Sequence, residues 1–201
     1  MKKIIICLCL MLPVLTAAAQ ESYFYFNLDI NTPMSNRDWV SSTSASGARV
    51  GYRKFINEKF SAGVDIGWAS YHQYFPTESF TDGTTTTTTD YFNYVTNYTF
   101  AASGQYNFKI KPEWLLPYAG IALGAANNKY TRYYNIYTDV DQSWGFLARP
   151  EAGVLVRLSQ RRSIGAMAAI HYDFSTAKSE TYNYTSFSNL GIQIGIMLME
   201  W

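Results

Sequence analysis

Eight segments of this chain alternate apolar and polar residues with a period of two, and no other feature constrains the fold as strongly. In the first segment, Phe24, Phe26 and Leu28 share one face, while Asn27 and Asp29 lie on the other. Successive side chains of a strand point to opposite faces, so the alternation predicts strands with one apolar face. The predicted strands cover residues 23–31, 46–55, 60–71, 97–108, 116–126, 144–158, 164–174 and 190–201.

The connections between these strands alternate between short and long. Short ones lie at residues 56–59, around Pro112 and at residues 159–162, whereas long polar ones lie at residues 33–45, 75–90, 127–142 and 176–187. Transmembrane barrels combine tight periplasmic turns with longer outer loops. We therefore expect both chain termini and the short turns to face the periplasm. The threonine run at residues 84–89 is interpreted as a mobile loop tip.

The predicted fold is all-β: an eight-stranded antiparallel up-and-down transmembrane β-barrel. In lipid, every backbone N–H and C=O needs a partner within the protein, so strands cross a membrane only as a closed barrel. Eight strands enclose an interior that side chains can fill. After the N-terminal segment, no run of about 18 residues is continuously apolar, so we expect no membrane-spanning helix.

The sizes of the two strand faces indicate which one meets lipid. The apolar sets hold large residues such as Phe100, Ile121 and Ile194, whereas the opposite sets hold the charges and small residues such as Gly63 and Gly124. Small residues suit a narrow lumen, and aromatic residues near strand ends suit the interfacial girdles of a membrane barrel. Charged residues make up only 15% of the chain, below the roughly 25% of typical soluble domains. A soluble lipocalin-like barrel, with its apolar face inside, is the alternative.

The N-terminus has the pattern of a secretory signal peptide. Lys2 and Lys3 precede an apolar run at residues 4–15, and small residues at 17–19 form a cleavage site before Gln20. We predict that residues 1–19 are removed and that residues 20–201 form a barrel in the outer membrane. Both cysteines would leave with the signal peptide, which excludes a disulfide or a thiolate site in the mature protein.

Little in the sequence indicates catalysis or a cofactor. A net charge of +1 does not favour nucleic acid as a partner. The two histidines, His72 and His171, lie in no cluster with metal-ligand spacing, so we expect neither a metal nor a cofactor. The segment His171-Tyr172-Asp173 resembles the His-x-Ser element of outer-membrane lipid A deacylases, but Asp173 takes the place of the serine and cannot act as that nucleophile. We expect no enzyme activity.

Residues 116–124, Leu-Pro-Tyr-Ala-Gly-Ile-Ala-Leu-Gly, resemble a recurrent strand of the outer-membrane β-barrel family that includes OmpA, OmpX and OmpW. The resemblance implies a monomeric eight-stranded barrel, inserted by the barrel assembly machinery among outer-membrane lipid and lipopolysaccharide. That machinery recognises an aromatic C-terminal residue, which Trp201 supplies. Trp201 is in phase with Met197 and Met199, whereas family members usually keep this aromatic in phase with the apolar face.

Charged residues on the inward face form the best-defined candidate site. The seven titratable residues that strand pairing brings together are Asp29, Arg49, Asp65, Arg149, Glu151, His171 and Asp173. The first three form one predicted cluster, with the arginine between the two aspartates. The other four form a second cluster, in which Arg149 faces Asp173 and Glu151 faces His171. Buried charges must be paired, so the simplest interpretation is that both clusters fill and stabilise the lumen. A gated path for ions or solutes is the alternative.

Tyrosines concentrate in the two later long loops. They are Tyr130, Tyr133, Tyr134, Tyr137, Tyr182 and Tyr184. Tyrosine suits a recognition surface because its ring is apolar and its hydroxyl forms hydrogen bonds. The alternative is that the strands continue above the membrane, since tyrosine also has good β propensity.

Together these features predict a small non-enzymatic outer-membrane barrel with a side-chain-filled lumen. Its expected role is envelope integrity or surface interaction through the outer loops. A narrow porin-like channel for small solutes or ions and a soluble periplasmic binding barrel are the competing functions.

Overall fold

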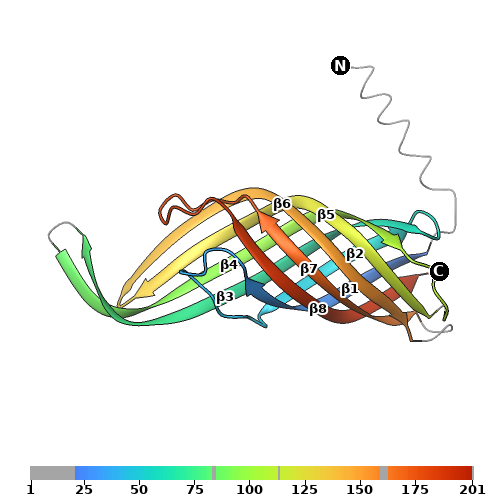
Figure 1. Cartoon of the computed structure of the whole chain (residues 1–201), viewed down its shortest axis with the longest axis horizontal. Helices are drawn as coiled ribbons and strands as arrows, with labels where there is room; N and C mark the ends of the chain where they lie inside the picture. The colour runs from blue at the N-terminus through green and yellow to red at the C-terminus, as the bar shows by residue number, and fades with distance from the viewer. Residues whose placement is uncertain (1–20, 83–84, 113, 159–162, 201) are drawn as a thin grey trace, which may run out of the picture.

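The described residues form one closed antiparallel barrel in which each strand pairs with its neighbours in sequence and β8 pairs with β1 (Figure 1). This computed structural model describes residues 21–82, 85–112, 114–158 and 163–200, so the predictions for the signal peptide and for Trp201 lie outside the described residues. The strands are β1 (Ser22–Pro33), β2 (Gly47–Phe55), β3 (Phe60–Asp82), β4 (Thr85–Asn107), β5 (Leu115–Tyr134), β6 (Tyr137–Arg157), β7 (Ile164–Ser175) and β8 (Phe187–Glu200). In this part of the chain, no helix is long and apolar enough to cross a membrane.

The two faces of the strands are oriented as the residue sizes predict. Phe100, Ile121 and Ile194 point outward and are 44, 51 and 58% exposed. The alternate positions point into the lumen, where Ala122 and Arg149 are fully buried. A wall with large apolar side chains outside and polar or small ones inside is suited to contact with hydrocarbon.

Two rows of aromatic side chains lie on the outer surface. Phe60 and Tyr106 lie side by side at one end of β3 and β4, with their ring centroids 5.1 Å apart. Farther along the same strands, Trp68 pairs with Tyr98, and Trp144 lies in the same row on β6. Eight residues separate Phe60 from Trp68, which corresponds to roughly 20 Å along the barrel axis for a tilted strand. These rows fit the interfacial girdles of a membrane barrel.

We call the end of the barrel that carries the 56–59 connection the turn end, and the opposite end the loop end. β1 begins and β8 ends at the turn end. At the loop end, the β3–β4 hairpin projects farthest, with the β5–β6 hairpin beside it (Figure 1). The loops at residues 34–46 and 176–186 also lie at this end, as expected from their polarity.

Two of the four predicted long loops are wrong. Residues 75–82 and 85–90, and residues 127–134 and 137–142, lie in strands that continue past the loop-end girdle, in the β3–β4 and β5–β6 hairpins. The threonine run is also part of β4 as far as the structure describes it, and Thr88 pairs with Ser79. Threonine and tyrosine have good β propensity, so these polar segments remain extended. A break in the pairing between Phe75 and Glu78 accommodates Pro76, which has no N–H to donate.

We call the part of β3–β6 beyond the loop-end girdle the extension; it comprises residues 70–82, 85–96, 129–134 and 137–142. The two loops cover its inner face next to the barrel, whereas residues 76–79 and 137–140, farther out, are exposed. Ser41 of the first loop donates both its backbone N–H and its hydroxyl to Gln73, and Ser179 of the second donates its hydroxyl to Asp141. The extension is therefore a curved sheet whose inner face is packed next to the barrel and whose outer face continues the wall of the barrel.

Candidate functional site

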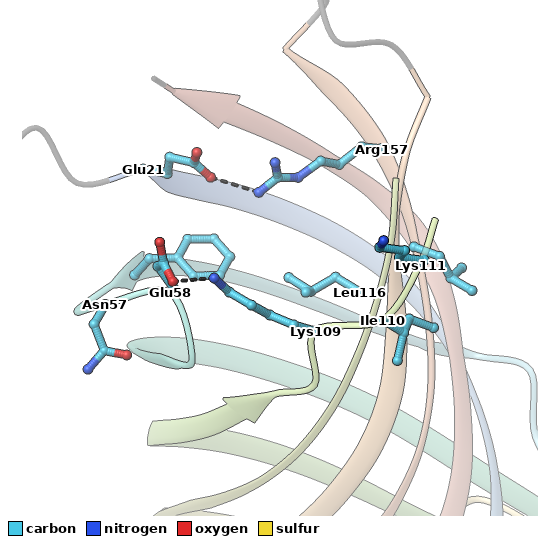
Figure 2. A pocket seen from close by; sticks show the side chains of 10 residues that line it. Glu21, Asn57, Glu58, Lys109, Ile110, Lys111, Leu116 and Arg157 are labelled. Carbon is cyan, nitrogen blue, oxygen red and sulfur yellow. Dashed lines mark hydrogen bonds and ion pairs between the residues drawn. The ribbon is translucent and has the colours of Figure 1, made fainter. Parts of the chain in front are cut away.

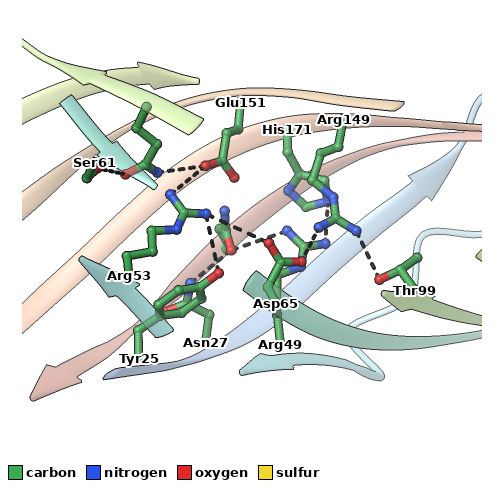
Figure 3. Close-up of polar contacts among 12 residues, drawn as sticks. Tyr25, Asn27, Arg49, Arg53, Ser61, Asp65, Thr99, Arg149, Glu151 and His171 are labelled. Atoms are coloured by element: carbon green, nitrogen blue, oxygen red, sulfur yellow. Dashed lines mark hydrogen bonds and ion pairs between the residues drawn. The ribbon is translucent and has the colours of Figure 1, made fainter. Parts of the chain in front are cut away.

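The predicted charged residues lie together in the middle of the lumen, where three arginines from β2 and β6 meet four carboxylates. Figure 3 shows the three arginines with Asp65, Glu151 and His171. Alternation along each strand turns these side chains inward. The three arginines, the four carboxylates and His171 are each 5% exposed or less. Such a cluster is stable only when its charges are paired, because an unpaired ion in the interior is strongly destabilising.

Arg149 on β6 joins three other strands. Its Nε lies 2.5 Å from Oδ1 of Asp173 on β7, and its Nη1 lies 2.7 Å from Oδ1 of Asp65 on β3. Its Nη2 donates to the hydroxyl of Thr99 on β4 at 3.0 Å. The predicted pair of Arg149 with Asp173 is present, and the contact with Asp65 reaches across the lumen.

Arg49 pairs with Asp29 at 2.9 Å, as predicted, but it makes no ion pair with Asp65 among the described residues. The prediction assumed a register in which both aspartates stand opposite the arginine. In the structure Asn27 stands opposite Arg49 on one side and Gly67 on the other. The long guanidinium still reaches Asp29 diagonally, whereas Asp65 turns to Arg149.

Glu151 and His171 stand opposite each other in the strand register, as predicted, but their side chains have other partners. Glu151 forms an ion pair with Arg53 at 2.9 Å and accepts a hydrogen bond from Gln105 at 2.7 Å. His171 lies 3.1 Å from the side-chain oxygen of Asn31 and 3.4 Å from a guanidinium nitrogen of Arg49.

The two predicted clusters are therefore one network. Arg49 lies 3.7 Å from Asp173, and Arg53 lies 3.9 Å from Asp65, which also binds Arg149. Arg53 was not among the predicted site residues, although it alternates in phase with Arg49. This shared phase could have assigned Arg53 to the lumen site from the sequence. For Gln105 and Thr99 the sequence offers no such indication, because each is uncharged and binds a charged residue across the lumen.

An apolar layer closes the lumen on the turn-end side of the network. Its largest fully buried members are Tyr23, Tyr25, Tyr118, Leu155, Met167 and Met197. Gly51 allows this packing, because a Cβ at that position would lie 2.5 Å from the ring of Tyr25. The Tyr25 hydroxyl lies 3.3 Å from a guanidinium nitrogen of Arg53, so the layer and the network are in contact.

A vestibule of about 650 Å³ opens at the turn end (Figure 2). Glu21 and Arg157 form an ion pair of 2.7 Å across it, and Lys109 pairs with Glu58. Its lining includes Phe55, which also belongs to the apolar layer. The vestibule therefore ends against packed side chains.

On the loop-end side, aromatic residues form a third layer, which we call the aromatic cap. Trp39, from the loop between β1 and β2, is its centre and is 2% exposed. Its ring lies 5.9 Å from Tyr130, 4.1 Å from Tyr182 and 6.3 Å from Tyr184. Arg132 lies over the Trp39 ring at 4.6 Å.

The six tyrosines predicted as a recognition surface thus divide into separate groups. Tyr130, Tyr182 and Tyr184 belong to the aromatic cap. Tyr134 and Tyr137 pack together at the tip of the β5–β6 hairpin, and Tyr133 points outward from β5. The alternative of strand extension therefore describes the four tyrosines on β5 and β6, Tyr130, Tyr133, Tyr134 and Tyr137. The cap was not predicted because it depends on Trp39 from a distant loop.

Hydrogen bonds fix the cap and its tyrosines stay neutral. Asn36 donates to the hydroxyl of Tyr130 at 2.9 Å, and the hydroxyl of Tyr184 donates to Asp38 at 2.6 Å. Burial raises the pKa of Tyr130 well above its ordinary value. Burial and the hydrogen bond to Asp38 do the same for the pKa of Tyr184.

Between the cap and the network, a cavity of about 10 Å³ is bordered by Asp29, Arg49 and Tyr71. That volume holds at most about one water molecule. In the ranges that the structure describes, no three His, Asp or Glu side chains are arranged to hold a metal ion. His171 and Asp173, the pair with a resemblance to deacylases, are enclosed in the network, away from the lipid face.

Comparison with known proteins agrees with this architecture. No curated protein matches the chain in sequence. Among solved structures, Neisserial surface protein A superposes with a TM-score of 0.54 at 15% identity, covering 90% of this chain and 97% of that one. Ail, the attachment invasion locus protein of Yersinia pestis, superposes with a TM-score of 0.52 at 12% identity, covering 91% and 100%. These similarities show a shared fold. The model of the outer membrane protein beta-barrel domain matches residues 4–198, so the chain belongs to this outer-membrane barrel family.

Proposed function

We propose that this protein is a closed, non-enzymatic outer-membrane barrel that acts through the surface at its loop end. The supporting observation is the filled lumen: the apolar layer, the ionic network and the aromatic cap follow one another along the barrel. A barrel closed in this way does not conduct ions or solutes through its lumen. Its function then resides on the outside, where the extension and the two loops present the largest surface beyond the membrane.

In this proposal the turn end faces the periplasm and the loop end faces the cell exterior. Short turns on the periplasmic side and long hairpins outside are usual in such barrels. We further propose that the barrel is a monomer inserted by the barrel assembly machinery. The closed ring supports the monomer, because β1 pairs with β8 along its whole described length and leaves no free edge in the membrane.

Cysteine labelling of intact cells tests the orientation and the surface role. Thr88 lies near the tip of the β3–β4 hairpin and Asn57 lies in the turn between β2 and β3, and both are exposed. A membrane-impermeant maleimide should label a Thr88→Cys variant on intact cells and an Asn57→Cys variant only after lysis. The unsubstituted protein is the control for background labelling. The reverse pattern would place the extension in the periplasm and remove the proposed function.

A further inference from the structure

Five aromatic side chains form a continuous patch on the outer face of the extension, and the lumen and the cap use none of them. They are His72 and Tyr74 on β3, Phe92 and Tyr94 on β4, and Tyr133 on β5. Their rings form pairs: His72 with Tyr94 at 5.8 Å, Tyr74 with Phe92 at 5.0 Å, and Tyr94 with Tyr133 at 5.4 Å. Tyr74, Phe92 and Tyr133 are 52, 40 and 47% exposed. We call this set the outer aromatic patch.

The patch continues the lipid-facing surface of the barrel. His72 and Tyr74 lie four and six residues beyond Trp68 of the loop-end girdle, on the same face of the same strand. With about 3.3 Å per residue and the usual tilt, the patch lies roughly 10 to 15 Å above the girdle. It faces sideways, toward whatever surrounds the barrel at that height. In an outer membrane with the loop end outside, that layer is the saccharide of lipopolysaccharide.

A basic residue lies between the girdle and the patch. Lys129 is on the outward face of β5. It lies two residues beyond the position on β5 that pairs with Trp144 of the girdle, and four residues before Tyr133. This order, from hydrocarbon contact to girdle, cation and aromatic rings, matches the order of acyl chains, phosphates and sugars in a lipopolysaccharide molecule. A cation near a membrane surface attracts anionic headgroups.

We propose that the outer aromatic patch and Lys129 bind the phosphorylated core saccharide of lipopolysaccharide. The flat faces of sugar rings expose C–H groups that pack on aromatic rings, while tyrosine hydroxyls form hydrogen bonds with sugar hydroxyls. Lys129 supplies the positive charge for a phosphate group. Binding would hold the extension upright in the saccharide layer. The inference rests on the proposed orientation, because only the outer leaflet presents these sugars.

Two matched double variants test the proposal in the full chain refolded in detergent. The patch variant combines Tyr94→Thr with Tyr133→Thr, which removes one packed ring pair. The control combines Tyr134→Thr with Tyr137→Thr, which removes the ring pair at the hairpin tip, where the centroids are 5.7 Å apart. Threonine keeps good β propensity. Heat-dependent gel mobility verifies folding, and if the patch variant does not fold, Tyr133→Thr alone takes its place.

The probes are lipopolysaccharide with a complete core, lipid A without a core, and inorganic phosphate. We expect the patch variant to bind the complete molecule about tenfold more weakly than the unsubstituted protein and to bind lipid A unchanged. Tyr133→Thr alone should show a smaller loss in the same direction, and the control variant should show none. A Lys129→Gln variant should weaken binding of both lipid probes, and free phosphate should compete with them.

Equal affinities of the patch variant and the unsubstituted protein for the complete molecule would overturn the proposal. So would an equal loss for lipid A, which would assign the patch to acyl chains. If the unsubstituted protein instead self-associates and only the patch variant does not, the patch is an interface between copies and the saccharide assignment is wrong. Because this binding is measured in detergent, it does not depend on orientation, so its failure is distinguishable from a failure of the labelling experiment.

Discussion

At Arg149 a single guanidinium contacts side chains from three other strands, so this residue concentrates the electrostatics of the lumen. Asp65 and Asp173 both depend on it, and both are buried. Loss of one partner of a buried pair leaves an uncompensated charge, which is more destabilising than loss of the whole pair. The network therefore stabilises one arrangement of the walls, and its arginines are its most sensitive members.

Replacement of Arg149 by Met should lower the free energy of unfolding by about 3 to 5 kcal/mol, because Asp65 and Asp173 lose their principal cation. Urea unfolding in lipid vesicles, followed by tryptophan fluorescence, measures this loss. Arg157→Met is the control, since the pair of Arg157 with Glu21 is partly exposed in the vestibule and is expected to contribute no more than about 1 kcal/mol. Equal losses in the two variants would contradict the account.

Parity along each strand predicted correctly which residues enter the lumen, but it did not predict all their partners. The pairs of Arg49 with Asp29 and of Arg149 with Asp173 follow from neighbouring strands. The contact of Asp65 with Arg149 joins opposite walls, and no count of residues across a turn indicates it. A two-residue difference in register was enough to assign Asp65 to the wrong arginine.

At the scale of elements, polarity proved a poor guide to where β3 to β6 end. The sequence predicted the eight strands and the alternation of turns and loops, because the apolar face must match the hydrocarbon layer. Beyond that layer no such requirement exists, and segments rich in Thr and Tyr were interpreted as loops. Pairing continues there because Thr and Tyr keep good β propensity. Next to the barrel the two loops also cover the inner face, and Asn135, with a φ of 52°, allows a tight turn between β5 and β6.

The aromatic cap depends on Trp39. A Trp39→Ala variant should release the loops at residues 34–46 and 176–186, because the ring contacts with Tyr130, Tyr182 and Tyr184 are lost. The local cost is about 3 to 5 kcal/mol, so limited proteolysis should cleave both loops much faster while the strands stay intact. Trp144→Ala, which removes an outward girdle ring, is the control and should leave the loops protected. Unchanged cleavage in Trp39→Ala would show that other contacts hold them.

Docking of the 176–186 loop should weaken in acid. Burial alone would raise the pKa of Asp141, but hydrogen bonds from Ser179 and Thr181 outweigh it and the pKa is lowered. The pKa of this carboxyl is lower in the docked state than in the open state. Its full contribution to docking is therefore present when the pH is above the ordinary pKa, and the contribution is lost as the pH falls through the lowered pKa.

Hydrogen exchange of the loop, compared at neutral pH and near pH 3, measures this effect. The unsubstituted protein should exchange faster in acid than the intrinsic rate explains, whereas an Asp141→Ala variant should already be open at neutral pH and show no further opening. Loop protection that is the same at both pH values in the unsubstituted protein would contradict the role of Asp141.

For the whole molecule, the three layers divide the barrel into a vestibule at the turn end, a filled lumen and an extension at the loop end. Each layer draws on strands or loops far apart in sequence, so closure of the barrel and filling of the lumen depend on each other. The inside and the outside of the barrel have different roles: the side chains in the lumen stabilise the fold, and the outer face of the extension is available for binding. Membership of the outer-membrane barrel family is consistent with both.

Conductance in a planar lipid bilayer tests the closed lumen most directly. The purified full-length protein should insert and produce no unitary current steps at any voltage that the bilayer withstands, because the network and the layers on both sides of it leave no continuous water path. Reproducible steps that change in size or ion selectivity when Arg53 or Arg149 is replaced would show that ions pass the network, and the account of a closed barrel would be wrong.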